Sequence, residues 1–124
     1  GGLNALMARA NANFAVVDAF VGNSDWLGHL AREPETRSNT SVCLSITDPQ
    51  ITALDCDAQA AFAKALVSLL DKEGVAFDIG AYRDAPPGLR IWTGGTIETS
   101  DLEALMPWLD WAYQSTRAAL ANAA

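Results

Sequence analysis

Residues 82–92 read YRDAPPGLRIW, and this stretch decides how the second half of the chain folds. After the Pro-Pro-Gly turn, apolar side chains alternate with Arg90 and Trp92, which is the period of a β-strand with one buried face. Residues 75–82 alternate in the same way, and a proline–glycine segment between two alternating runs is typical of a hairpin. We therefore predict an antiparallel hairpin of residues 75–82 and 89–93.

The flanking sequence predicts three helices and one further strand. Apolar residues recur at spacings of three and four in three segments, and residues 41–47 alternate as a strand does. The helices are expected at residues 3–21, from Asp55 or Asp57 to Gly74, and from Ser100 to about Asn122, with Pro107 as the point where the last one can kink. The expected order is α-β-α-β-β-α. This is an α+β fold with helices packed on one face of a small, mostly antiparallel sheet.

The composition argues against several classes of function. A chain of 124 residues is expected to form a single domain, residues 1–124. The net charge of −7 and the lack of any run of Lys or Arg argue against nucleic-acid binding. No apolar run approaches the roughly 20 residues that a membrane-spanning helix needs. We expect neither nucleic acid nor a membrane as a partner.

Metal-binding, disulfide and nucleophilic sites also find little support. Cys43, Cys56 and His29 are too few and too scattered for a zinc site, so no metal is expected. We interpret both cysteines as reduced and mostly structural, which fits a cytoplasmic protein. His29 has no Ser, Cys or paired carboxylate near it in the sequence, and Lys64 and Lys72 are expected on the solvated face of one helix.

Arg83 and Arg90 are the best candidates for a binding site. They flank the Pro-Pro-Gly turn, and the planar fork of arginine donates two parallel hydrogen bonds to a carboxylate or phosphate. If the apolar residues of 89–93 face the helices, Arg90 and Trp92 face away from the core. A site for a small dianion or trianion is one interpretation. The other, of about equal weight, is a solvated arginine with its stem along a tryptophan.

Trp108 and Trp111 form a second notable feature. They lie one turn apart on the last helix and off its core stripe, which consists of Leu102, Leu105, Met106, Leu109, Ala112 and Tyr113. Two exposed indoles would create an apolar patch of the size that marks an interface. Either residues 26–30 cover the pair within this chain, or another domain or subunit does.

Three stretches resemble one family. The runs RSNTSVCL (37–44), GAYRDAPPGLRIW (80–92) and LMPWLDWA (105–112) resemble the C-terminal domain of phosphoserine aminotransferases. The resemblance covers essentially the whole chain and is most specific at residues 82–92. It implies the small domain of a fold-type I enzyme that depends on pyridoxal 5′-phosphate. It also implies that the chain is the C-terminal small domain of a longer enzyme, without the large cofactor-binding domain.

The same resemblance implies a reaction and its site. The parent enzyme would transfer an amino group from glutamate to 3-phosphohydroxypyruvate in serine biosynthesis, giving O-phosphoserine and 2-oxoglutarate, as a homodimer. Arg90 matches the family arginine that binds the substrate α-carboxylate. Arg83 matches an arginine near the distal phosphate, and Tyr82 stands where the commoner pattern has a histidine. The cofactor would be bound by the large domain, so this chain is expected to carry no catalytic residue and to be inactive alone.

Without the resemblance, two other functions fit the sequence. The chain could be a stand-alone amino-acid-binding or regulatory module in which Arg83 and Arg90 grip an effector carboxylate. It could also be a dimerisation domain whose main surface is Trp108 and Trp111, with the arginines incidental.

Overall fold

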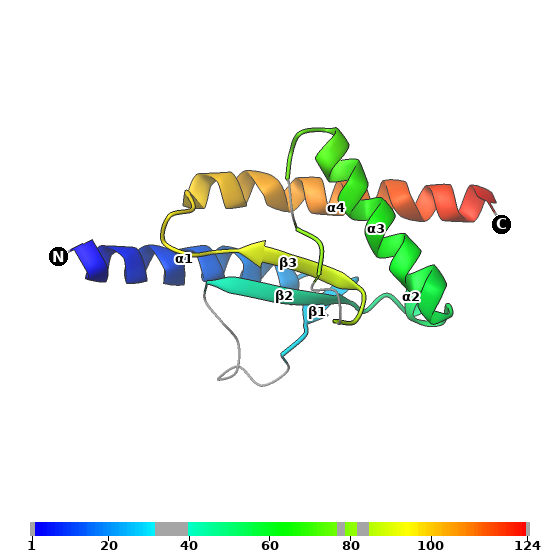
Figure 1. Cartoon of the computed structure of the whole chain (residues 1–124), viewed down its shortest axis with the longest axis horizontal. Coiled ribbons are helices and arrows are strands. Elements are labelled where there is room, and N and C mark those ends of the chain that lie inside the picture. Colours follow the sequence, from blue (N-terminus) through cyan, green and yellow to red (C-terminus); the bar gives the residue numbers. More distant parts are fainter. Residues whose placement is uncertain (1, 32–39, 77–78, 82–84, 124) are drawn as a thin grey trace.

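The computed structural model describes residues 2–31, 40–76, 79–81 and 85–123, which form an α+β fold. Within these residues four helices accompany one three-stranded sheet. In chain order the elements are α1 (Gly2–Gly22), β1 (Leu27–His29), β2 (Ser41–Ile46), α2 (Pro49–Thr52), α3 (Cys56–Lys72), β3 (Gly88–Trp92) and α4 (Thr99–Ala123). In Figure 1, β2 and β3 pass in front of α1, α4 runs along the long axis of the molecule, and α3 crosses α4.

The sheet is antiparallel throughout and has the order β1-β2-β3. Val42 pairs with Ile91 and Leu44 pairs with Leu89, and all four side chains are buried. The strand predicted at 41–47 and the inward face predicted for β3 are therefore confirmed. Because side chains alternate along a strand, the residues between them face away from this core.

The three long helices follow their apolar stripes. The buried residues that join them to the sheet are Val17, Val21, Phe62, Leu66, Leu70, Leu102, Met106, Leu109, Ala112 and Tyr113. Asp55, not Asp57, caps α3, since its carboxylate accepts a hydrogen bond from the Ala58 amide at 2.8 Å. Helix α4 begins at Thr99, one residue before the predicted Ser100, and continues through Pro107.

The predicted strand at 75–82 is the main correction. Gly74 ends α3 with a φ of +71°, and the amides of Val75 and Ala76 then bond to the carbonyl of Leu70. These amides close the helix and so cannot join a sheet. Of the described residues, Gly80 forms a single antiparallel bridge with Leu89; residues 77, 78 and 82 lie outside the described part.

Two short elements were not predicted. β1 pairs with β2 on the edge opposite β3. At the start of β1, the Ser24 hydroxyl accepts hydrogen bonds from the backbone amides of Trp26 and Leu27. α2 starts after Asp48, whose carboxylate accepts from the Gln50 amide at 3.0 Å. Asp48-Pro49 thus ends the strand as expected and also begins a helical turn.

A buried asparagine joins α1 to the loop that follows β3. The side-chain nitrogen of Asn13 lies 3.3, 3.1 and 2.9 Å from the carbonyl oxygens of Thr93, Gly94 and Ile97. Its side-chain oxygen accepts a hydrogen bond from the Thr99 hydroxyl. Asn13 is completely buried, so these bonds satisfy a polar group that would be costly to leave alone.

Neither a membrane span nor a metal cluster is found in the described residues. None of the helices there is both long enough and apolar enough to cross a bilayer. The same residues contain no group of three His, Cys, Asp or Glu side chains that could hold an ion. Cys43 is half-buried, Cys56 is exposed, and both are free thiols.

Candidate functional site

Arg90 and Trp92 share the face of β3 that points away from the core. In the register of the sheet, Arg90 stands across from Cys43 and Trp92 across from Ser41. Trp92 is 47% exposed, whereas Arg90 is half-buried. The guanidinium carbon of Arg90 lies 5.2 Å from the centre of the Trp92 ring, within the range of a cation–π contact. The predicted orientation of both side chains is confirmed.

This geometry bears on the two interpretations of Arg90. A solvated arginine with its stem along a tryptophan would also be half-buried beside an exposed indole, so this geometry fits both interpretations. In a binding role, the ring would restrict the guanidinium and leave less side-chain entropy to be lost when an anion binds. Binding of an anion by Arg90 stays a prediction.

The other two predicted site residues, Tyr82 and Arg83, lie outside the described residues. Their described neighbours, Ala81 and Ala85, line the same small cavity. Whether Arg83 and Arg90 act on one ligand stays a prediction.

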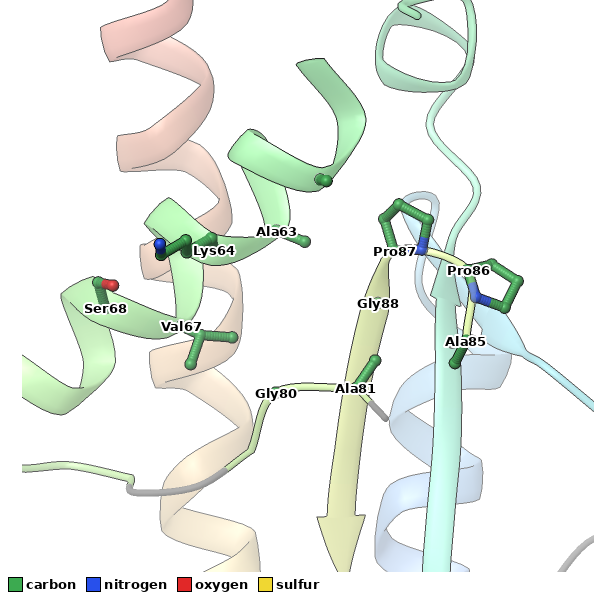
Figure 2. A pocket seen from close by; sticks show the side chains of 11 residues that line it. Ala63, Lys64, Val67, Ser68, Gly80, Ala81, Ala85, Pro86, Pro87 and Gly88 are labelled. Carbon is green, nitrogen blue, oxygen red and sulfur yellow. The ribbon is translucent and has the colours of Figure 1, made fainter. Parts of the chain in front are cut away.

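That cavity, about 290 Å³ in volume, lies between α3 and the Pro-Pro-Gly turn (Figure 2). Lys64, Val67 and Ser68 form the α3 wall, while Pro86 and Pro87 stand on the opposite side. It is at the small end of the size range of ligand pockets, and mostly apolar atoms line it. Arg90 does not line it. The cavity is therefore separate from the surface that Arg90 and Trp92 form.

Gly88 fixes the position of β3 and thereby that of Arg90. A Cβ atom at residue 88 would lie 1.9 Å from the carbonyl oxygen of Leu44. The two strands can pair at this distance because glycine has no side chain. Gly88 pairs with Ser45, so the close approach lies two residues before Arg90.

A buried polar cluster centres on Asp48 and was not predicted. Its carboxylate accepts a hydrogen bond from the Tyr113 hydroxyl and lies 3.4 Å from the guanidinium of Arg117. Arg117 also donates to the Tyr113 hydroxyl at 3.2 Å and to the side-chain oxygen of Gln50. Trp26 stacks on Tyr113 with ring centres 4.3 Å apart and donates from its indole nitrogen to Asp110 at 2.8 Å.

The cluster shifts the pKa values of Asp48, Tyr113 and Arg117. Burial alone would raise the pKa of Asp48, but the bonds from Tyr113 and the Gln50 amide, with the charge of Arg117, outweigh it and lower the pKa. Burial and the bond to Asp48 raise the pKa of Tyr113. The bond to Tyr113 raises the pKa of Arg117. Asp48 is thus held ionised as the link between α2 and α4.

This cluster predicts a loss of stability in acid. Because the pKa of Asp48 is lowered in the folded state, the unfolded chain binds a proton at Asp48 more tightly than the folded chain does. The free energy of unfolding therefore falls as the pH drops below the ordinary carboxyl pKa of about 3.9. Asp48→Asn is expected to cost about 1–3 kcal/mol at pH 7 and to flatten this acid dependence. Urea unfolding at pH 7 and in the acid range measures both. An unchanged acid slope in Asp48→Asn would contradict the assignment, and Tyr113→Phe should give a smaller effect of the same sign.

His29 has a carboxylate partner that the sequence did not reveal. Its Nε2 lies 2.8 Å from Oδ1 of Asp18, and its ring stacks on Phe14 at 5.9 Å. The His29 side chain is 6% exposed. A ring held in this way joins β1 to α1, so its evident role is structural.

Trp108 and Trp111 are exposed, at 40% and 39%. The alternative that residues 26–30 cover them is wrong, because Trp26 is buried against Tyr113 instead. The two indole rings meet edge to face, with centres 5.2 Å apart and an angle of 86° between their planes.

No family model matches the chain, but two known proteins are similar to it. The chain is 48% identical over 113 residues to the phosphoserine aminotransferase of Methanosarcina mazei and 47% identical over 113 residues to that of Methanosarcina barkeri. Each match covers 91% of this chain and 28% of the relative, so the chain spans little more than a quarter of their length. The chain is therefore homologous, over most of its length, to a segment of phosphoserine aminotransferases.

Proposed function

We propose that this chain is the substrate-binding small domain of a phosphoserine aminotransferase. The enzyme would exchange an amino group between glutamate and 3-phosphohydroxypyruvate, giving O-phosphoserine and 2-oxoglutarate. The observation that carries the proposal is Arg90, half-buried on the outer face of β3 in a chain homologous to these enzymes. The longer enzyme would work as a homodimer.

In this proposal Arg90 binds the α-carboxylate that both amino-acid substrates share. A guanidinium donates two parallel hydrogen bonds to a carboxylate, and this pair fixes orientation as well as position. The Trp92 ring at 5.2 Å limits the directions in which the fork can point. Orientation of this kind aligns the reacting carbon, which is a major contribution that binding makes to rate.

Arg83 and Tyr82 are proposed to bind the distal phosphate of the substrate. They follow Ala81, whose neighbour Gly80 bridges to Leu89, one residue before Arg90. Binding at both ends of a small substrate would select for its length and charge.

The cofactor is proposed to bind outside this chain. Pyridoxal 5′-phosphate supplies the electron sink for transamination and needs a lysine to hold its aldehyde. The two lysines here, Lys64 and Lys72, are both exposed on α3, and although Lys64 borders the cavity beside the Pro-Pro-Gly turn, neither side chain is buried. The residues of this chain therefore do not fit the cofactor, and their proposed task is to bind the substrate.

Two assays of the purified proteins test the proposal. The longer enzyme is expected to convert O-phosphoserine and 2-oxoglutarate to glutamate, whereas the 124-residue chain with added pyridoxal 5′-phosphate should show no activity. The chain alone should also lack any visible absorbance band that borohydride abolishes. Activity in the isolated chain would overturn the assignment of a substrate-binding part, and lack of activity in the longer protein would overturn the function.

A regulatory module that binds amino acids is the second candidate. The same outward Arg90 would then hold an effector carboxylate. Binding of an amino acid to the isolated chain at micromolar concentration, without transamination by the longer protein, would favour this alternative.

A further inference from the structure

The exposed tryptophans of α4 border a cavity that Arg90 does not line. It has a volume of about 520 Å³ and is lined by Glu73, Ala104, Pro107, Trp108 and Trp111. Glu73, the residue that follows α3, contributes the one carboxylate among the described residues that line it. The cavity therefore combines two indole walls with a single negative charge.

The two rings are arranged as a corner. Their planes are 86° apart, so a group in the corner lies over the face of one ring and beside the other. The face of an indole carries negative electrostatic potential, and tryptophan is the best aromatic partner for a cation. A carboxylate beside such a corner adds charge of the same sign, so the surface is complementary to a positive group.

Elsewhere in the structure, two aromatic rings have arginines from this chain placed over them. Arg90 lies over Trp92 at 5.2 Å, and Arg117 lies over Tyr113 at 5.9 Å. Within the described residues, no Lys or Arg is found over Trp108 or Trp111. This corner is thus a cation site that the described part of the chain leaves open.

We propose that this cavity, formed by Trp108, Trp111 and Glu73, binds an arginine side chain of another polypeptide segment. Arginine fits better than lysine, because a planar guanidinium can stack on one indole while its fork donates to the Glu73 carboxylate. A polypeptide is the favoured source, because the relatives carry the homologous segment within a chain of which it is 28%. The site is independent of the function proposed for Arg90.

The direct test is an NMR titration of the 124-residue chain with the peptide acetyl-Gly-Arg-Gly-amide. The indole N–H signals of Trp108 and Trp111 are expected to shift progressively over roughly tens of millimolar peptide, because one exposed cation–π contact and one surface ion pair together supply about 2 kcal/mol. Trp26 and Trp92 should not shift and serve as internal references. The same peptide with citrulline in place of arginine has the same shape without the charge, and it should bind at least about tenfold more weakly.

Three variants make the outcome decisive. Glu73→Gln should weaken arginine-peptide binding by about two- to fivefold, while Asp57→Asn, an equal charge change at the other end of α3, should leave it unchanged. Trp111→Leu should abolish the shift of Trp108. Equal binding of the citrulline peptide, or no effect of Glu73→Gln, would overturn the proposal and leave an apolar surface. Equal binding of a lysine peptide would overturn the preference for a guanidinium.

Discussion

Under the function proposed above, replacing Arg90 by alanine in the longer enzyme is expected to lower kcat/KM by about 100- to 1,000-fold. Two charge-assisted hydrogen bonds to a carboxylate together contribute about 3–4 kcal/mol, and about 1.4 kcal/mol corresponds to tenfold in rate. Arg90→Lys should recover little of this loss, because an ammonium is a point charge and cannot reproduce the planar fork. Steady-state kinetics with both amino-acid substrates measures the effect.

The pattern across substrates identifies the group that Arg90 binds. If it holds the α-carboxylate, kcat/KM should fall alike for O-phosphoserine and for glutamate, since both carry that group. A fall confined to O-phosphoserine would instead place the phosphate at Arg90. Arg9→Ala is the matched control, because Arg9 is an exposed arginine whose ion pair with Glu98 spans 3.6 Å and contributes little. Full activity of Arg90→Ala with an unchanged melting temperature would favour the dimerisation-domain alternative.

Gly88→Ala is expected to cause the largest loss of stability. The new methyl group would lie 1.9 Å from the carbonyl oxygen of Leu44, so β2 and β3 would have to separate. Overpacking against a backbone that cannot yield costs about 2–4 kcal/mol. Urea unfolding of the chain measures this change, and loss of dispersed amide signals from β2 and β3 would show that the strand pairing is disturbed.

Gly80→Ala supplies the matched comparison. Gly80 also pairs with β3, through its bridge to Leu89, but a Cβ atom there would meet nothing within 4 Å. The substitution is therefore expected to be neutral, or to stabilise by up to about 1 kcal/mol because alanine restricts the unfolded chain. If the two variants had equal stability, the close approach of Gly88 to Leu44 would not be what fixes the strand.

The sequence predicted the fold wherever local pattern and tertiary packing agree. The apolar stripes gave α1, α3 and α4, and the alternation gave β2 and β3 with the correct inward faces. It did not predict β1, because three residues with no alternation become a strand through pairing with β2. The prediction at 75–82 was wrong at its start, because the end of α3 takes up the amides of Val75 and Ala76, whereas Gly80 does form an antiparallel bridge with Leu89.

In the candidate site too, local pattern predicted some features and tertiary packing decided the others. The alternation of side chains along β3 was enough to place Arg90 and Trp92 on the outer face of the sheet. The bond between Asp48 and Tyr113 joins residues 65 positions apart, and no local pattern connects them. Polar clusters of this kind depend on where the fold places Tyr113 and Arg117 of α4 relative to Asp48, which a single sequence does not reveal.

The buried side chain of Asn13 has a mechanical consequence. It ties α1 to the carbonyl groups of Thr93, Gly94 and Ile97, and Thr93 directly follows the strand that carries Arg90. A displacement of α1 along its axis would therefore either break these hydrogen bonds or move the end of β3 with it. In the function proposed above, an anion bound to Arg90 would move with that strand.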